Sequence, residues 1–296
     1  MPHKKFVESL VRDASAVLAS LGAQHEVRWV VDESTYLAEK MPDRASFEET
    51  ARKSLQKILE RRKSGEPLAY IFGHWAFREH EFKVGPGALI PRPETEELVE
   101  FSLKAAPRRS PLRVADLGAG TGCIGISYAF ELSRARPQDE IQLFLVERSP
   151  EARTWLEQNV ATFRPLLSKV SIEVVPCAWE DWEASILDVI LSNPPYVTED
   201  EAQKLESSVV DFEPRQALVP FDETRWSDAS GPYRSILEFS ARHLAPGGQL
   251  WLEFGVAQVA RLEGIARQTG LFSESFVIKD MAGKDRILRA IRGATD

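Results

Sequence analysis

Within the first 66 residues, apolar positions recur every three or four residues, a spacing typical of amphipathic helices. The first apolar stripe, which Gly22 ends, consists of Phe6, Leu10, Val17, Leu18 and Leu21. A second helix is predicted from Ser46 to Arg62, where Ser46 and Glu49 match a capping box. Residues 1–66 therefore predict a small helical domain.

Alternating apolar and polar residues replace this pattern over residues 67–90. The extended segments predicted there are residues 69–73, 75–77 and 81–84. We expect this stretch to form a β-hairpin linker. It leads to Pro91 and Pro93, which stiffen a loop, and acidic residues then open a helix. A rigid loop of this kind could form the wall of a pocket.

From residue 91 onward, short apolar runs alternate with helical segments. Five runs are predicted strands of one sheet: residues 112–117, 141–147, 170–175, 187–191 and 249–254. Alternation of strands and helices predicts right-handed crossovers and a mostly parallel sheet. Two more strands, near 275–278 and 286–291, are joined by a short turn, so the last strand should run antiparallel to its neighbours. We expect an α/β domain with a seven-stranded sheet.

Composition limits the class of protein. The 296 residues include 37 Lys and Arg against 45 Asp and Glu, a net charge of −8, which argues against a duplex-binding protein but leaves room for a local basic groove. Cys123 and Cys177 lack the spacing of metal ligands or of a disulfide framework, so we expect two small buried side chains. Because no run resembles a secretion signal or a membrane span, we expect a cytoplasmic protein.

The predicted strand 187–191 stops abruptly at Asn193-Pro194-Pro195-Tyr196. Two consecutive prolines cannot continue a strand, so the chain must leave the sheet at its carboxyl edge, where open α/β sheets bind ligands. The Asn193 amide oxygen and the Pro194 carbonyl could accept hydrogen bonds from a planar –NH2 group, and Tyr196 could pack against its flat face. That group is a side-chain amide or a nucleobase. The alternative is a loop that merely ends a strand.

Three further features match a cofactor that contains a nucleoside. Gly118, Gly120 and Gly122 let the backbone turn tightly and approach a ligand, whereas a dinucleotide fingerprint would need its third glycine one residue later. Glu147 ends the next strand, where it could accept hydrogen bonds from ribose hydroxyls. Trp179 could cover an adenine ring. The alternatives are a structural turn, an exposed strand end and a core aromatic residue, respectively.

Motifs spread over the chain combine into one specific pattern, made of residues 65–67, 70–71, 90–96, 116–122, 193–196, 212–218, 233–234, 246–248 and 280–286. With these motifs the whole chain resembles the release-factor glutamine methyltransferases, a family of class I (Rossmann-like) methyltransferases. Asn-Pro-Pro-Tyr alone would not separate this family from enzymes that methylate amino groups in DNA. The helical N-terminal domain, the Pro-Arg-Pro-Glu-Thr-Glu loop and the Phe-Glu-Pro-Arg run make the distinction.

The resemblance implies a role for each part of the chain. Residues 1–66 would recognise the substrate, residues 67–90 would be a linker, and residues 91–296 would form the methyltransferase domain. S-adenosylmethionine would be held by Asp116, Gly118, Ala119, Gly120, Thr121, Gly122, Glu147, Trp179 and Asn193. The substrate glutamine would lie against Pro93, Glu94, Thr95, Asn193, Pro194, Pro195 and Tyr196. The catalytic residues would be Asn193, Pro194 and Tyr196.

The implied reaction is direct methyl transfer to the N5 nitrogen of the glutamine in the Gly-Gly-Gln motif of a peptide chain release factor. The protein would act as a monomer, with no metal, no membrane and no stable nucleic-acid partner. Three alternatives remain open. They are methylation of a glutamine in a ribosomal protein, methylation of adenine in DNA or RNA, and a non-catalytic scaffold that binds S-adenosylmethionine.

The chain departs from the family pattern at two places. The family usually has an acidic residue before the tryptophan, where this chain has Ala178, so Glu180 or Asp181 would have to supply an adenine contact. Residues 220–226 intrude where the family is short and rich in glycine, which leaves the rim of the substrate site undefined.

Overall fold

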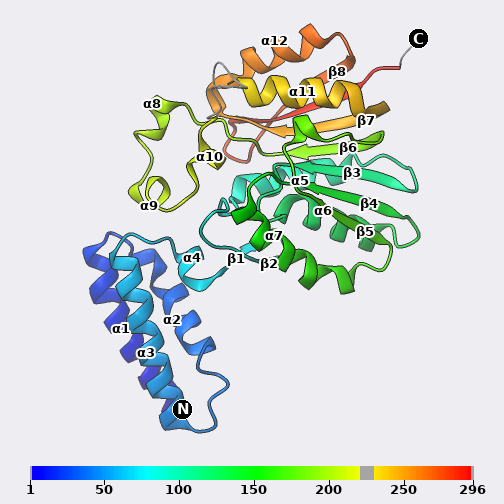
Figure 1. Cartoon of the computed structure of the whole chain (residues 1–296). Coiled ribbons are helices and arrows are strands. Elements are labelled where there is room, and N and C mark those ends of the chain that lie inside the picture. The colour runs from blue at the N-terminus through cyan, green and yellow to red at the C-terminus, as the bar shows by residue number, and fades with distance from the viewer. Residues whose placement is uncertain (1, 221–229, 295–296) are drawn as a thin grey trace. The chain divides into compact units, whose positions relative to one another are not determined.

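The computed structural model describes residues 2–220 and 230–294, which form two compact units (Figure 1). One unit comprises Met1–Gly73 with Ser207–Phe212, and the other comprises His74–Glu206 with Glu213–Asp296. The intrusion noted at residues 220–226 lies outside the described residues, apart from its first position. No helix in the described ranges has the length and apolarity needed to cross a membrane.

The first unit is made of helices around an apolar core. They are α1 (Pro2–Ser20), η1 (Gln24–Glu26), α2 (Val27–Tyr36), α3 (Arg44–Lys63), α4 (Leu68–Phe72) and α9 (Ser207–Val210). Side chains at helical spacing are buried in this core, among them Leu10, Leu18, Val30 and Leu55. Gly22 follows α1 in the left-handed conformation, with φ at 69°. The predicted helical region is confirmed, although the sequence pattern did not reveal α2.

Two local predictions for this unit are wrong. Asp43, not Ser46, caps α3, because its carboxylate accepts hydrogen bonds from the Ser46 backbone N–H (3.0 Å) and hydroxyl (2.8 Å). The segment predicted as extended at residues 69–73 is the helix α4, which Gly73 ends with φ at 79°. A short apolar run has no periodicity that distinguishes a strand from a buried helical turn.

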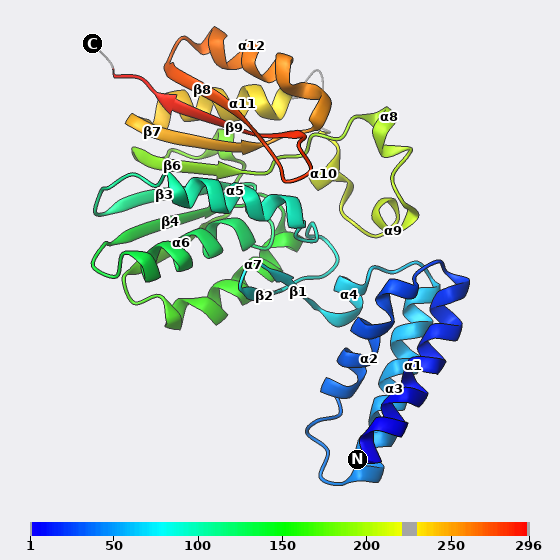
Figure 2. The same cartoon turned by 180° about the vertical axis from the view of Figure 1, so that it is seen from behind.

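The second unit contains a two-stranded hairpin and a seven-stranded sheet (Figures 1 and 2). The hairpin strands are β1 (His74–Phe77) and β2 (His80–Lys83). The sheet strands are β3 (Leu112–Leu117), β4 (Ile141–Val146), β5 (Val170–Val175), β6 (Leu187–Ser192), β7 (Leu244–Glu253), β8 (Phe272–Lys279) and β9 (Asp285–Arg292). Their order is β5-β4-β3-β6-β7-β9-β8, and β9 alone of these strands runs antiparallel to both neighbours. The predicted sheet is confirmed.

Helices cover both faces of this sheet. The longer ones are α5 (Pro93–Lys104), α6 (Cys123–Ala135), α7 (Pro150–Phe163), α11 (Gly231–His243) and α12 (Val259–Thr269). The short ones are η2 (Arg164–Leu166), η3 (Trp179–Asp181), α8 (Glu199–Ala202), α10 (Arg215–Leu218) and η4 (Val256–Gln258). Val114 lies in a core with α5, α6 and α7, and its neighbour Ala115 lies in a second core with α11 and α12. Cys123 is buried as predicted, but Cys177 is only half-buried, so that prediction was wrong.

The strand order creates the place where a ligand can bind. β3 and β6 are neighbours, but the chain continues from β3 to β4 on one side and from β6 to β7 on the other. A switch of this kind opens a crevice at the carboxyl ends of the two strands. Leu117, the last residue of β3, pairs with Ser192, the last residue of β6. The loops that follow these strands therefore begin side by side.

Candidate active site

The two loops that the sequence singled out begin at this edge of the sheet. The glycine loop starts at Gly118 and the Asn-Pro-Pro-Tyr loop starts at Asn193. The Ser192 hydroxyl donates a hydrogen bond to the Leu117 carbonyl (2.7 Å), which ties the two strand ends together. Both loops thus contribute to one cavity.

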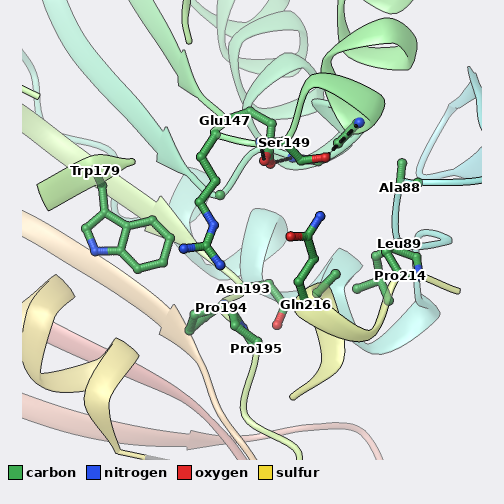
Figure 3. Close-up of a pocket in the computed structure, with 16 residues that line it drawn as sticks. Ala88, Leu89, Glu147, Ser149, Trp179, Asn193, Pro194, Pro195, Pro214 and Gln216 are labelled. Carbon is green, nitrogen blue, oxygen red and sulfur yellow. Dashed lines mark hydrogen bonds between the residues drawn. The ribbon is translucent and has the colours of Figure 1, made fainter. Parts of the chain in front are cut away.

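This cavity, shown in Figure 3, is a pocket with walls from segments far apart in the sequence. Its lining residues are Gly87, Ala88, Leu89, Gly118, Gly120, Glu147, Arg148, Ser149, Ala152, Trp179, Asn193, Pro194, Pro195, Pro214, Gln216 and Ala217. Residues predicted for the cofactor and residues predicted for the substrate therefore meet in the same pocket.

The glycine loop approaches the pocket with its backbone. Gly118, Gly120 and Gly122 have positive φ angles of 72°, 58° and 81°, a conformation that favours glycine. A Cβ atom on Gly120 would meet no atom within 4 Å, so open space lies in front of the loop. A Cβ atom on Gly122 would lie 2.6 Å from Leu156, so this glycine serves helix packing. The predicted loop residues that do not line the pocket in the described chain are Ala119, Thr121 and Gly122.

Glu147 follows β4 and borders the pocket. Its Oε1 accepts a hydrogen bond from the Ser149 backbone N–H (2.8 Å), and its Oε2 accepts one from the Gly120 backbone N–H (2.8 Å). The side chain is buried, and burial raises its pKa above the ordinary value for a glutamate, while the two backbone hydrogen bonds oppose the rise. Each carboxylate oxygen can accept a further hydrogen bond, so Glu147 can receive the two hydroxyls of a ribose.

Asp116 lies behind the glycine loop and, among the described residues, is not part of the pocket wall. Its Oδ2 accepts a hydrogen bond from the Gly125 backbone N–H (2.9 Å) near the start of α6. Burial raises the pKa of Asp116 to about 7. In this structure Asp116 holds α6 against the end of β3, and the cofactor contact expected from the sequence stays a prediction.

Trp179 forms the wall opposite Ala88 and Leu89 in Figure 3. Its indole nitrogen donates to the Ser235 hydroxyl (2.8 Å), and this hydroxyl donates to Glu180 (2.7 Å). These bonds hold the ring beside Gly118. Glu180 is thereby directed toward α11, and neither it nor Asp181 lines the pocket in the described chain. Their positions do not support either residue as a substitute for the acidic side chain that the family usually has at the position of Ala178.

Asn193 lines the pocket at the end of β6, and Thr95 orients its side-chain amide. Asn193 Nδ2 donates to the Thr95 hydroxyl oxygen (3.1 Å). Thr95 is buried in the first turn of α5, so packing fixes the partner in place. With its nitrogen engaged, the amide presents Oδ1 as a hydrogen-bond acceptor. Pro93 and Glu94, on the same turn, are exposed and do not line the pocket in the described residues.

Tyr196 points away from the pocket toward the end of β7. Its hydroxyl donates to Glu253 Oε1 (3.3 Å), and its backbone carbonyl accepts a hydrogen bond from Gln258 Nε2 (2.9 Å). Burial and the Glu253 charge raise the pKa of Tyr196. Tyr196 is not among the described residues that line the pocket, so its predicted contact with a flat substrate group stays a prediction.

Glu213 joins two walls of the pocket, a link that the sequence analysis missed. Its buried carboxylate accepts hydrogen bonds from the Ile90 backbone N–H (3.0 Å) and from Arg92 (2.5 Å). The residues involved lie in two motifs that the sequence analysis noted, residues 90–96 and 212–218. Their presence in one chain was the only sequence signal of the link.

Two further lining residues also escaped prediction. Figure 3 shows Gln216 extending its side-chain amide into the pocket. Arg148 directly follows Glu147 and lines the same pocket. Both are neighbours of residues that the sequence analysis had singled out, and adjacency in sequence was the one available signal for them.

Comparison with known proteins places this geometry in a family. The sequence model of the family described as "Methyltransferase small domain" matches residues 98–212. The release factor glutamine methyltransferase of Bacteroides thetaiotaomicron is 35% identical over 244 residues, which is 81% of this chain and 81% of that protein. The enzymes of the same name from Bifidobacterium longum and Cereibacter sphaeroides are 31% and 33% identical. They cover 96% of this chain, and 99% and 92% of their own lengths, respectively.

Among solved structures, a putative class I S-adenosylmethionine-dependent methyltransferase from Listeria monocytogenes is 14% identical, with a TM-score of 0.48. The match covers 99% of this chain and 88% of that one. The mostly parallel sheet with its antiparallel β9 is the class I methyltransferase architecture. Since the curated relatives also match over most of their lengths, the chain belongs to the release factor glutamine methyltransferase family.

Proposed function

We propose that this protein transfers a methyl group from S-adenosylmethionine to the side-chain nitrogen of the glutamine in the Gly-Gly-Gln motif of a peptide chain release factor. The orientation of the Asn193 amide carries the proposal: its nitrogen is bonded to Thr95, and its oxygen is left to accept. A substrate glutamine presents two N–H donors on one planar nitrogen. Asn193 Oδ1 and the Pro194 carbonyl form a matching pair of acceptors.

The residues around the glycine loop fit S-adenosylmethionine. The open space in front of Gly120 leaves room for a ligand to approach the backbone. The Glu147 carboxylate can accept the ribose hydroxyls, and Trp179 offers a flat apolar ring beside the same space. When bound, this cofactor supplies a methyl group on a positively charged sulfur, which makes the methyl group electrophilic.

Asn193 and Pro194 would contribute by orienting the substrate. An amide nitrogen is a weak nucleophile, because its lone pair is delocalised into the carbonyl group. By accepting both N–H bonds, the two residues hold the nitrogen in line with the methyl group and stabilise the positive charge that grows on nitrogen. As the N–C bond forms, the S–C bond breaks. One N–H proton then leaves, and the product is a neutral N-methyl amide.

We also propose that the helical unit recognises the release factor. This unit has its own core, and it exposes large apolar side chains near α2 that include Trp29 (49% exposed), Tyr36 (61%) and Leu37 (49%). Exposed apolar groups of this size are typical of protein-binding surfaces. Replacing Trp29 and Tyr36 by alanine should raise the KM for the release factor and leave kcat unchanged. An unchanged KM would argue against this role.

Mass spectrometry of a purified, unmethylated release factor tests the main proposal. The factor is incubated with this protein and S-adenosylmethionine, and Asn193→Ala serves as the control variant. We expect one added methyl group on the Gly-Gly-Gln glutamine with the wild type and none with Asn193→Ala. Cofactor binding, measured by calorimetry, should change by no more than about threefold in the variant, since Asn193 acts on the substrate.

The absence of transfer by the wild type, with cofactor binding intact, would contradict the proposal. The same preparation would then be tested against ribosomal proteins and nucleic acids. Transfer that persists in Asn193→Ala would keep the substrate but reject Asn193 as the residue that orients it.

A further inference from the structure

Glu253 is a buried carboxylate behind the Asn-Pro-Pro-Tyr loop. It is the last residue of β7, and the residue before it, Leu252, pairs with Ser192 at the end of β6. Glu253 and Asn193 therefore occupy neighbouring positions at the edge of the sheet. The Glu253 side chain is 1% exposed. Because a buried carboxylate is costly unless its oxygens accept hydrogen bonds, its partners indicate its role.

Two of these partners belong to the candidate active site. The Tyr196 hydroxyl donates to Glu253 Oε1 (3.3 Å). The Thr95 hydroxyl also hydrogen-bonds to the carboxylate. Glu253 thus contacts both the residue that orients Asn193 and the tyrosine that ends the Asn-Pro-Pro-Tyr loop.

The single proton of the Thr95 hydroxyl gives this chain of hydrogen bonds a direction. A carboxylate can only accept, so the Thr95 proton goes to Glu253. The Thr95 oxygen is then left to accept from Asn193, which turns Nδ2 toward Thr95 and Oδ1 away from it. If the Thr95 proton pointed to Asn193 instead, the amide would turn over, since its two ends are nearly equal in size. It would then face the N–H groups of a substrate amide with its own N–H groups.

We propose that Glu253 is a positioning residue for methyl transfer: by accepting the Thr95 proton, it keeps the Asn193 amide oxygen directed at the substrate nitrogen. This inference rests on the proposed function, because it concerns the same acceptor. Glu253 itself does not touch the substrate. It makes the site select a group that donates N–H bonds over one that accepts hydrogen bonds.

A second set of hydrogen bonds keeps Tyr196 within reach of Glu253. Gln258 Nε2 donates to the Tyr196 carbonyl (2.9 Å), and the Tyr233 hydroxyl donates to Gln258 Oε1 (2.6 Å). The Tyr233 hydroxyl in turn accepts from the Gly255 backbone N–H (3.2 Å). The end of the Asn-Pro-Pro-Tyr loop is therefore fastened to the segment that follows β7.

The charge of Glu253 gives the proposal a pH signature. Burial raises the pKa of Glu253 to about 7, and the nearby Glu94 raises it further, whereas Thr95, Arg286 and Tyr196 oppose the rise. Below this pKa the carboxyl group is protonated and can donate to Thr95, which removes the direction of the hydrogen-bond chain. The kcat of the wild type should therefore increase as the pH rises through about 7.

Glu253→Gln tests the proposal, because glutamine keeps the size of the side chain but can donate to Thr95 at every pH. At pH 8 we expect kcat on the release factor to fall about 10-fold to 100-fold and the cofactor Kd to stay within about threefold. The increase of kcat through pH 7 should disappear. A purely structural role for Glu253 would not change the pH profile in this way.

Thr95 supplies a second and independent test. Thr95→Val keeps the shape of the side chain but removes the hydroxyl, and it should lower kcat as Glu253→Gln does, whereas Thr95→Ser should stay within about threefold of the wild type. Ser102→Ala is the matched control, since Ser102 is a buried residue of the same helix whose hydroxyl bonds to the carbonyl of Val99 (2.9 Å). It should leave kcat unchanged.

The outcomes separate this inference from the proposed function. Failure of the wild type to methylate the release factor would overturn the proposed function, and this inference with it. Transfer by the wild type together with wild-type kcat values in Glu253→Gln and Thr95→Val would overturn this inference alone. Melting temperatures of all variants identify any variant that fails to fold, in which case the other variant decides.

Discussion

The carboxylate of Glu213 accepts a hydrogen bond of 2.5 Å from the guanidinium of Arg92, although 121 residues separate the two along the chain. The Glu213 side chain is 1% exposed, so the charge has been removed from water almost completely. The same carboxylate accepts the Ile90 backbone N–H. This arrangement fastens the loop before α5 to the segment that supplies Pro214 and Gln216 to the pocket.

Glu213→Ala should therefore destabilise the second unit by at least about 2 kcal/mol, because it leaves the Ile90 N–H and the Arg92 charge without their buried partner. Urea unfolding measures the loss. Glu199→Ala is the control, since Glu199 pairs with Arg215 but both side chains are more than half exposed. The control should lose less than about 1 kcal/mol. Equal losses in the two variants would contradict the role given to Glu213.

Glu147→Gln should weaken cofactor binding. The neutral amide forms weaker hydrogen bonds with ribose hydroxyls than a carboxylate, and it donates where Gly120 and Ser149 need an acceptor. We expect the Kd for S-adenosylmethionine to rise at least about tenfold in calorimetric titrations, which is about 1.4 kcal/mol. Asn193→Ala provides the contrast, with a Kd near that of the wild type. If the two variants bound the cofactor equally well, Glu147 would not be a ribose ligand.

Gly120 and Gly122 should respond differently to substitution by alanine, although both have positive φ angles. Gly122→Ala places a Cβ atom 2.6 Å from Leu156 Cδ1 and 2.9 Å from Ile126 Cδ1, so it should lower the melting temperature clearly. Gly120→Ala meets open space, and its cost is mainly the left-handed conformation, about 1 kcal/mol. It should instead weaken cofactor binding. Thermal unfolding and calorimetry on both variants compare the two effects.

Asp116 should make the folded protein more stable in mild acid than at neutral pH. Burial raises its pKa from the ordinary 3.8 to about 7 in the folded state, so the folded state binds this proton more tightly. The contribution is fully present below about pH 4 and is lost as the pH rises through about 7. Asp116→Asn is neutral at every pH and should lack this dependence.

The measurement for Asp116 is the free energy of unfolding of the wild type and of Asp116→Asn between pH 4.5 and 7.5. The wild-type value minus the variant value should decrease as the pH rises. Glu253 shifts stability in the same direction, but it is present in both proteins and cancels in the difference. A difference that stays constant with pH would show that Asp116 is ionised in the folded protein throughout this range.

Much of the fold was predictable because the signals for it are local. Buried strands that alternate with helices are visible as apolar runs, and the short turn between β8 and β9 predicts the antiparallel last strand. Local competition also explains the errors. Asp43 and Ser46 are both good caps, and only the structure shows which one accepts the hydrogen bond. The short apolar stretch of α4 has no period that could identify it as a helix.

By itself, the sequence determined which residues constrain the backbone. The glycines at 118 and 120 and the prolines at 194 and 195 restrict φ and hydrogen bonding in any context, so the two loops of the pocket were identifiable from residue type. Only the tertiary structure decided which side chains meet there. The contacts of Thr95 with Asn193 and of Arg92 with Glu213 join segments about a hundred residues apart. They exist because strand order and buried packing bring those segments together, and no local pattern encodes a partner at that distance.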